Sequence, residues 1–434
     1  MRTLGAGGAA ALGLSRAKAD GAPTPRDAPA SGEERAWHQL GLFEDPVMES
    51  QLLHFLAATY QQQADIGEVL DTARKIDEAD PWSWPDTWLA TAQRVRDMGE
   101  HSLARGHRIS SGHAFLRAAN YYRAALIHHP DPTHPSGLEA AKLAVHTYER
   151  AVTLLRLPAE RVNIPYEGTH LLGYFFRAHG ADGRAPLLIM HQGRDAWPEE
   201  SRYIVDAALE RGMHCLIFHG PGQGMAIREK NLPFRHDWER VVTPVVDFAL
   251  RQHGVDPDRV ILTGLSMGGA LAPRAAAFEP RLSVLIPNPG VLSWWDAQRR
   301  SFAQYFPDAW PLRERDPAAF DAAIYAAMRE VRLYDWYMRD AMHKHGAHSP
   351  SDYMTKLEDF DNTRVVDRIR CRTLVMDGTA EAFSAGEGTR LYDALSCPKA
   401  YLLFNEEDTG LLHCQEGAQA VANHRMFDWL DEQL

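Results

Sequence analysis

The feature that most constrains the fold is an alternation of short apolar runs with longer amphipathic runs from about residue 161 onward. The apolar runs suit β-strands, and the amphipathic runs between them suit helices. The expected strands are 162–166, 171–177, 186–191, 214–219, 259–264, 282–287, 372–377 and 399–404, and the expected helices are 198–211, 236–253, 267–278, 388–395 and one from about 415. This alternation predicts an α/β fold in which a mostly parallel eight-stranded sheet, opened by an antiparallel hairpin, carries helices on both faces.

Residues 34–158 follow another pattern, and we expect them to form an N-terminal all-helical domain. Apolar residues recur there at helical spacing, as at Phe115, Ala118 and Tyr122. Such a helix pair resembles a tetratricopeptide-type hairpin. A single pair cannot build a solenoid, so we expect it to pack against the rest of the chain and close a pocket. Residues 1–33 are rich in Ala, Gly, Pro and Ser and are expected to be a flexible tail.

A long segment interrupts the sheet domain, which is expected to span residues 159–434. Between about 289 and 369 the strand pattern stops, and the segment is helical and rich in aromatic residues. It is too long for an ordinary connection between elements. An insertion at this point lies over the carboxyl ends of the strands, where open α/β sheets bind ligands. We therefore expect residues 289–369 to form a helical cap over a binding site.

The strongest chemical signal is a G-x-S-x-G sequence at residues 264–268, with Ser266 at its centre. It stands between an expected strand and an expected helix. A serine in so tight a turn is typical of a nucleophile, because the turn exposes the hydroxyl and the helix N-terminus offers free N–H donors. The alternative is a Gly-rich turn in which Ser266 only caps the helix.

A nucleophilic serine needs a histidine base and an acid that orients the base. Where the chain order is Ser, acid, His, the acid follows a late strand and the His follows the last strand. His413 holds that position after the last expected strand. Glu381, beyond the end of the strand before it, is the first candidate for the acid. Asp377, at the end of that strand, and Asp408, nearer to His413 in the chain, are the alternatives.

Two backbone N–H groups are expected to stabilise the oxyanion that forms on the substrate carbonyl. One is that of Met267, directly after the nucleophile, and the other is that of Arg194, after a glycine in an early loop. The Arg194 side chain then lies near the pocket mouth. Alternatively, it is exposed and paired with Asp195.

Three further residues are candidates for the wall of the substrate pocket. His219 begins a Gly-rich loop that ends at the same sheet edge and is expected to form a tight turn without opening a helix directly. Trp294 and Trp295 follow the end of another expected strand. Most aromatic residues of the cap are expected to form its own core, but a few that face the pocket would suit a flat aromatic substrate.

In these motifs the chain resembles a group of α/β-hydrolases with a helical N-terminal domain. The matching stretches are 88–124, 218–246 (FHGPGQG and FRHDWERVVTPVVD), 263–270 and 391–429. The group includes bacterial 2,6-dihydroxypseudooxynicotine hydrolase and the fungal hydrolases that shorten polyketides to naphthopyrones. The resemblance implies an α/β-hydrolase fold. It also implies a triad of Ser266, Glu381 and His413 that hydrolyses beside a carbonyl, including carbon–carbon bonds of aryl ketones or 1,3-diketones.

The expected function is therefore that of a serine hydrolase without cofactor or metal, acting on an aromatic or polyketide-like small molecule. Ser266 attacks a carbonyl carbon while His413 takes its proton and later protonates the leaving group. A carboxylesterase or lactonase, and an acyltransferase or cyclase, would use the same triad and stay open. Outside enzymes, the alternative is a scaffold that kept the hydrolase fold.

Composition narrows the partners and the compartment. The formal net charge of −12 disfavours nucleic acid and anionic membrane surfaces as partners. No apolar run reaches the length of a membrane helix. The four cysteines have no metal or disulfide-scaffold spacing, which suits a reducing compartment, so we expect a cytoplasmic protein. An export signal within residues 1–19 is the alternative. The oligomeric state is left open, with a homodimer among the choices.

Overall fold

The computed structural model describes residues 36–178 and 183–434, so the expected tail and export signal lie outside the described residues. Its centre is one sheet with the strand order β1-β2-β4-β3-β5-β6-β7-β8. The strands are β1 (Ala159–Tyr166), β2 (Thr169–Phe176), β3 (Ala185–His191), β4 (His214–Phe218), β5 (Val255–Leu265), β6 (Val284–Asn288), β7 (Arg372–Gly378) and β8 (Lys399–Phe404). β1 pairs antiparallel with β2, and β2 with β4, while the remaining described pairs are parallel. The expected mostly parallel sheet with its opening hairpin is confirmed.

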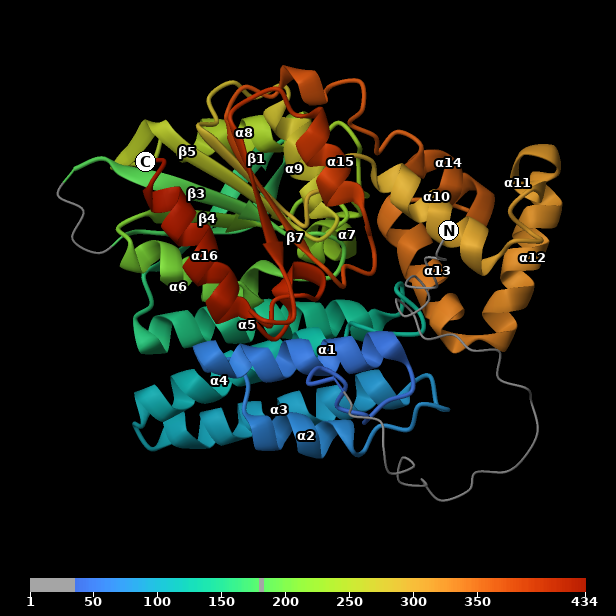
Figure 1. Cartoon of the computed structure of the whole chain (residues 1–434). Coiled ribbons are helices and arrows are strands. Elements are labelled where there is room, and N and C mark those ends of the chain that lie inside the picture. The colour runs from blue at the N-terminus through green and yellow to red at the C-terminus, as the bar shows by residue number, and fades with distance from the viewer. Residues whose placement is uncertain (1–35, 179–182) are drawn as a thin grey trace.

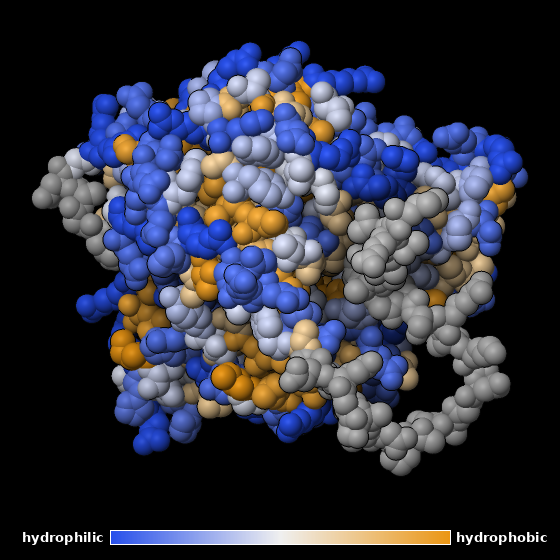
Figure 2. All heavy atoms as spheres, in the orientation of Figure 1, coloured by the Kyte–Doolittle hydropathy of each residue, from blue (hydrophilic) through white to orange (hydrophobic). Residues whose placement is uncertain are grey.

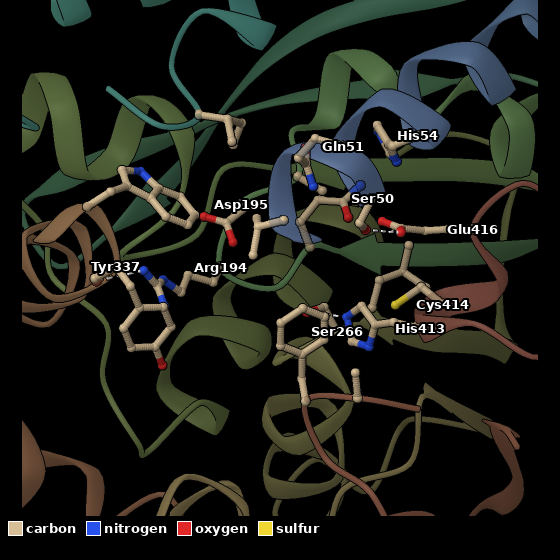
Figure 3. Close-up of a pocket in the computed structure, with 18 of the residues that line it drawn as sticks. Ser50, Gln51, His54, Arg194, Asp195, Ser266, Tyr337, His413, Cys414 and Glu416 are labelled. Carbon is tan, nitrogen blue, oxygen red and sulfur yellow. Dashed lines mark hydrogen bonds between the residues drawn. The ribbon is translucent and has the colours of Figure 1, made fainter. Parts of the chain in front are cut away.

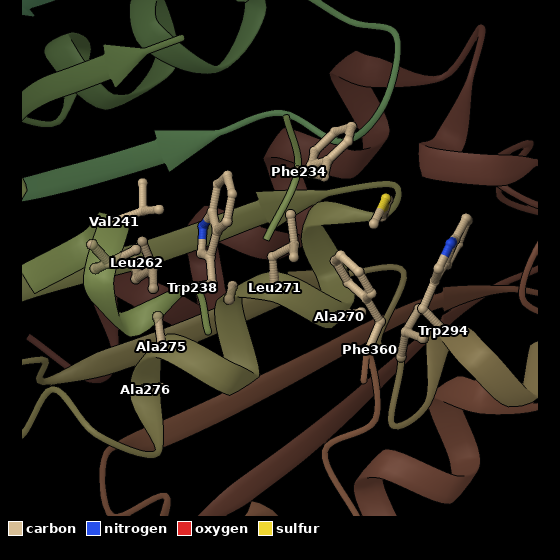
Figure 4. Close-up of a cluster of buried hydrophobic side chains, with 14 of the residues drawn as sticks. Phe234, Trp238, Val241, Leu262, Ala270, Leu271, Ala275, Ala276, Trp294 and Phe360 are labelled. Carbon is tan, nitrogen blue, oxygen red and sulfur yellow. The ribbon is translucent and has the colours of Figure 1, made fainter. Parts of the chain in front are cut away.

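Helices cover both faces of the sheet (Figure 1). One face carries α8 (Glu239–Ala249), α9 (Gly268–Ala276) and α15 (Glu387–Ala394), and the other carries α6 (Arg202–Glu210) and α16 (Gln419–Asp431). Because successive strand residues point to opposite faces, each face has its own hydrophobic core. On the first face Trp238 packs with Val241, Leu262 and Leu271, all of them buried (Figure 4). The two cores hold the sheet between its helices, and the site lies at the edge formed by the carboxyl ends of the parallel strands.

The Gly-rich loop after β4 opens the short helix α7 (Gly224–Lys230) directly, which corrects the expectation of a turn alone. Gly222 and Gly224 both have positive φ, at 79° and 39°. A Cβ at Gly224 would collide with the His219 ring. The loop therefore folds back on His219, the residue that begins it. Gly224, which makes this close approach, is also the first residue of α7.

The described part of the N-terminal region holds five α-helices, which confirms its expected all-helical character. They are α1 (Pro46–Ala57), α2 (Ile66–Ala73), α3 (Ser83–Ala104), α4 (Arg108–Ala124) and α5 (Pro135–Leu155), with the 3-10 turn η1 (Ala58–Gln61) between the first two. Asp45 caps α1 by accepting the N–H groups of Val47 and Met48, and Pro46 occupies the first helical position. The short helices α1 and α2 share a core with α3 and α4 around Trp88. Without α1 and α2, the hairpin of α3 and α4 would expose the apolar side chains of this shared core to solvent.

The segment between β6 and β7 forms a group of helices beside the sheet, shown in orange in Figure 1. They are α10 (Trp294–Tyr305), α11 (Leu312–Arg315), α12 (Pro317–Glu330), α13 (Arg332–His345) and α14 (Pro350–Leu357). They also touch the turn after α4, where His128 stacks on Trp336 of α13 with ring centroids 4.2 Å apart. Residues of the sheet domain, the cap and the N-terminal region line one common cavity.

The surface of the molecule is mostly hydrophilic on the face shown in Figure 2, and hydrophobic residues appear there as separate patches. Among the described residues, no helix combines the length and the apolar character needed to cross a membrane.

Candidate active site

Ser266 lies in the tight turn that joins β5 to α9. Its φ of +59° is left-handed, a conformation that non-glycine residues rarely adopt. The Ser266 N–H donates to the Asn288 carbonyl at 2.8 Å, which holds the turn against β6. A Cβ at Gly264 would overlap the Gly268 carbonyl, so a side chain at that position would prevent the turn. The strained turn presents the serine hydroxyl at the carboxyl edge of the sheet.

His413 lies between Ser266 and Glu381 and reaches both. Its Nε2 is 2.9 Å from Ser266 Oγ, and its Nδ1 is 2.7 Å from Glu381 Oε2. The other Glu381 oxygen accepts the N–H groups of Phe383 at 2.8 Å and Ser384 at 3.0 Å. An ionised Glu381 accepts a hydrogen bond from the Nδ1–H of His413, which leaves the Nε2 lone pair free to take the serine proton. Figure 3 shows the His413 ring facing Ser266 inside the cavity.

The charges of this trio support one another. Burial alone would lower the pKa of His413, but Cys414 and Glu381 hold that pKa well above its ordinary value. Burial also raises the pKa of the Cys414 thiol, so the Glu381 carboxylate is the charge that acts at neutral pH. Conversely, His413 and the two backbone N–H donors keep the pKa of Glu381 below its ordinary value against the effect of burial. An ionised carboxylate beside the imidazole favours the imidazolium that forms when the base takes a proton.

The two alternative acids lie elsewhere. Asp377 accepts hydrogen bonds from the Tyr401 hydroxyl at 2.8 Å and the Gly378 N–H at 2.9 Å, and burial raises its pKa to about 6. Asp408 forms an ion pair with Arg425. Neither forms a hydrogen bond with His413 among the described residues. The structure thus brings Glu381, and not Asp377 or Asp408, to the histidine.

The backbone N–H groups of Met267 and Arg194 both lie beside Ser266. Gly193 approaches the turn so closely that a Cβ there would lie 2.7 Å from the Met267 nitrogen. Neither N–H donates to another group in the part of the chain that the structure describes. The amide of Gln223 donates to the Gly193 carbonyl at 3.1 Å and to that of Gln192, which fixes the loop. Two free N–H donors on a fixed loop and turn beside the Ser266 hydroxyl match the geometry that an oxyanion hole requires.

The Arg194 side chain is buried and does not pair with Asp195, which corrects the alternative of an exposed pair. Its Nε and Nη2 donate to Asp340 Oδ2 at 3.1 and 2.9 Å. Lys344 Nζ lies 2.9 Å from the same oxygen and 2.7 Å from Asp195 Oδ1. Burial alone would raise the pKa of Asp340, but Lys344 and Arg194 hold it far below its usual range. This network of two buried cations, the buried Asp340 and the partly exposed Asp195 connects the loop that carries the Arg194 N–H (the oxyanion loop) to cap helix α13.

A cavity of about 200 Å³ opens onto Ser266 and His413. Its aromatic wall combines Tyr203, Trp294, Phe302, Tyr305, Phe306, Tyr334, Trp336, Tyr337 and Phe383. Trp294 therefore lines the cavity as expected, whereas Trp295 and His219 do not. Trp295 packs on Trp310 beneath the Arg313 guanidinium, because the next residue along a helix turns to a different side. His219 is fully buried and bonds Glu199 at 3.0 Å behind the site.

Residues of the N-terminal helices also line the cavity, which the sequence did not predict. Ser50, Gln51 and His54 come from α1, and Arg123 comes from α4. A signal for Arg123 existed, since it follows Phe115 and Ala119 at four-residue spacing along α4, where a cation stands out among apolar side chains. In the described ranges, no three His, Cys, Asp or Glu side chains gather as a metal site requires.

The fold and the arrangement of these residues define an enzyme of the α/β-hydrolase class. The family described as Alpha/beta hydrolase family matches residues 178–425, more than half of the chain, and the chain belongs to it.

Similarity to individual proteins extends over nearly the whole length. "Hydrolase LUC6" of Fusarium sp is 30% identical over 91% of this chain and 98% of its own. "20-hydroxy-prefusarin hydrolase FUS2" of Gibberella moniliformis is 29% identical over 90% of this chain and 97% of its own. The crystal structure of 2,6-dihydroxy-pseudo-oxynicotine hydrolase has a TM-score of 0.61 and 21% identity, covering 86% of this chain and 94% of that one. This last likeness shows a shared fold, N-terminal helices included. The expected group is thereby confirmed.

Proposed function

We propose that this enzyme hydrolyses a carbon–carbon bond beside a carbonyl of an aryl ketone or 1,3-diketone, with Ser266, His413 and Glu381 as its triad. The observation that carries the proposal is the position of the His413 ring between a serine hydroxyl at 2.9 Å and a buried carboxylate at 2.7 Å, beneath an aromatic cavity. The order of the three groups is that of a nucleophile, its base and the acid that orients the base.

The first half of the reaction transfers an acyl group to Ser266. Its Oγ attacks the carbonyl carbon as His413 Nε2 takes the hydroxyl proton, and the N–H groups of Met267 and Arg194 stabilise the oxyanion. Collapse of this intermediate breaks the bond between the acyl carbon and the neighbouring carbon. The electron pair leaves with that carbon as an enolate, which takes the proton from His413 and departs as a ketone.

The second half returns the enzyme to its starting state. Water attacks the acyl-serine ester as His413 takes one of its protons, and the new oxyanion uses the same two N–H groups. Collapse releases a carboxylic acid and restores the Ser266 hydroxyl. The sum is one diketone and one water giving one acid and one ketone.

The cavity wall supports an aromatic substrate. Aromatic pairs add about 0.5–1.5 kcal/mol beyond the burial of their area, and a short alkyl ester has no ring with which to form such pairs. The name of the FUS2 relative assigns to it the hydrolysis of 20-hydroxy-prefusarin, and the two chains are 29% identical over 408 aligned residues. The cavity wall and this relative together support the proposed aromatic or polyketide-like substrate.

The test compares 1-phenyl-1,3-butanedione with p-nitrophenyl acetate as substrates of the full-length enzyme. We expect cleavage of the diketone to a carboxylic acid and a methyl or phenyl ketone, with the higher kcat/KM of the two. Ser266→Ala should lower kcat by at least about 10³-fold on both substrates without changing the melting temperature. If the enzyme turns over the ester and not the diketone, the carbon–carbon hydrolase proposal fails and the enzyme is a carboxylesterase.

A further inference from the structure

Arg123 is a buried cation whose donors are poorly used. It is 3% exposed and lines the catalytic cavity. Its Nε lies 2.8 Å from Glu200 Oε2, but the N–H does not point along that line and makes no hydrogen bond. Its Nη1 and Nη2 reach Gln51 Oε1 and the Asp195 carbonyl only at 3.4 and 3.5 Å. A buried guanidinium normally makes shorter hydrogen bonds, so this one has donors to offer a ligand.

The surroundings of Arg123 hold it in place without satisfying it. Glu200, its counter-charge, also accepts the Trp197 N–H at 2.7 Å and faces His54 Nε2 at 3.3 Å. The Arg123 guanidinium lies over the Phe55 ring, 5.5 Å from its centroid. The pair of Arg123 and Glu200 is neutral overall, so this corner favours a neutral oxygen or one that gains charge during the reaction over a fixed anion.

Gln51 adds a second donor at the same corner. Its Oε1 faces Arg123, which turns its amide nitrogen away from that side chain. That nitrogen donates to no group among the described residues, and the side chain lines the cavity. In Figure 3 the Gln51 amide faces into the cavity across from Ser266.

Arg123 and Gln51 lie next to the loop that carries one of the proposed oxyanion donors. Arg123 Nη2 reaches the carbonyl of Asp195, the residue directly after the oxyanion donor Arg194. A group bound by Arg123 and Gln51 would therefore share the cavity with the carbonyl that Ser266 attacks, next to the loop that carries the Arg194 N–H. In a 1,3-diketone the second oxygen lies two carbons from the reacting carbonyl carbon, within one cavity of this size.

We propose that Gln51 and Arg123 form a second oxygen site, which binds the enolate oxygen of the leaving group. The inference rests on the proposed function, because only a diketone-type substrate places an oxygen there. As the carbon–carbon bond breaks, its electron pair delocalises onto this oxygen, which then carries the negative charge. The two donors stabilise that charge until His413 returns the proton to carbon. Their contribution is realised in the transition state, so it acts on kcat more than on KM.

The test measures kcat and KM of Gln51→Leu and Arg123→Lys on 1-phenyl-1,3-butanedione and on phenyl acetate, which has no second carbonyl. Leu keeps the size of Gln51, and Lys keeps the charge opposite Glu200 but loses the planar fork. We expect kcat on the diketone to fall on the order of 10²-fold for Gln51→Leu, and kcat on the ester to change by less than about threefold. Gln419→Leu is the matched control, because it removes an amide from the same cavity wall that makes no hydrogen bond with Arg123 among the described residues. It should change both rates by the same factor.

The outcomes separate this inference from the proposed function. A selective loss on the diketone supports the second oxygen site. If both variants keep wild-type rates, or lose the diketone and the ester alike, the site is refuted and the diketone reaction stands. If the wild-type enzyme cleaves the ester but no diketone, the proposed function fails and this inference fails with it. Melting temperatures of all variants show whether a loss comes from unfolding.

Discussion

Replacing Asp340 by Asn tests whether cap helix α13 holds the oxyanion loop in its working position. Asp340 is buried, and its Oδ2 accepts two N–H groups of Arg194 and faces Lys344 Nζ at 2.9 Å. Asn keeps the shape and removes the charge, so two buried cations share only Asp195. Breaking a buried ion pair by changing one partner costs about 3–5 kcal/mol, and we expect a loss of stability in that range.

The same change should reduce catalysis through Arg194. Its N–H is one of the two proposed oxyanion donors, and losing one such donor costs about 10²–10³-fold in kcat. A displaced loop loses part of the stabilisation that the Arg194 N–H gives to the oxyanion. We therefore expect kcat for p-nitrophenyl acetate to fall at least tenfold while KM changes by less than about threefold. Urea unfolding measures the stability, and the kinetics are measured at a temperature where the variant is folded.

Asp335→Asn is the matched control, since Asp335 lies on the same helix and pairs with Arg339 at the surface, 2.8 Å away. Exposed pairs contribute about 0–1 kcal/mol, so this variant should keep both its stability and its kcat. Equal effects of the two substitutions on stability and on kcat would refute the idea that the buried network positions the loop.

Three further predictions concern the triad and the cavity. Glu381→Gln should lower kcat by about 10³-fold or more and shift the acidic limb of the pH–rate profile to lower pH, because the anion that raises the pKa of His413 is gone; an unchanged profile would contradict the assignment. Asp377→Asn should leave kcat nearly unchanged. Burial raises the pKa of Asp377 to about 6, so the folded state binds this proton more tightly than the unfolded state does. The free energy of unfolding of the wild type should therefore fall by up to about 3 kcal/mol as the pH rises from about 4 to about 6. Urea unfolding across that range should show the loss in the wild type and not in Asp377→Asn. Trp294→Ala should raise KM for an aryl diketone more than for p-nitrophenyl acetate, whereas Trp295→Ala should affect stability only; equal kinetic effects of the two would contradict the placement of the cavity wall.

Local patterns carried most of what the sequence could predict. The run before Gly264 and the glycines around Ser266 placed the turn between a strand and a helix, because both the turn and its neighbours depend on residues close in the chain. His413 followed from chain order after the last strand. These features need no knowledge of how distant segments pack.

What the sequence could not give depends on contacts between distant segments. Asp340 meets Arg194 only because the cap folds over the sheet edge, and nothing near either residue in the chain indicates the pair. Trp294 and Trp295 have the same side chain, and only the start and rotation of α10 decide which one faces the cavity. Gln51 reaches the site because α1 packs against the sheet domain, where Ser50 bonds Glu416 and His54 faces Glu200.

The central claim is that Ser266 carries the acyl group of a substrate whose carbon–carbon bond is broken. The most direct measurement is rapid quenching of the full-length enzyme with 1-phenyl-1,3-butanedione in ¹⁸O-water, followed by intact-mass and peptide mass spectrometry. The account predicts a transient acyl adduct on the peptide that contains Ser266, and a carboxylic acid product that gains one ¹⁸O atom. Diketone cleavage with no adduct on that peptide, and with more than a tenth of the activity left in Ser266→Ala, would contradict it.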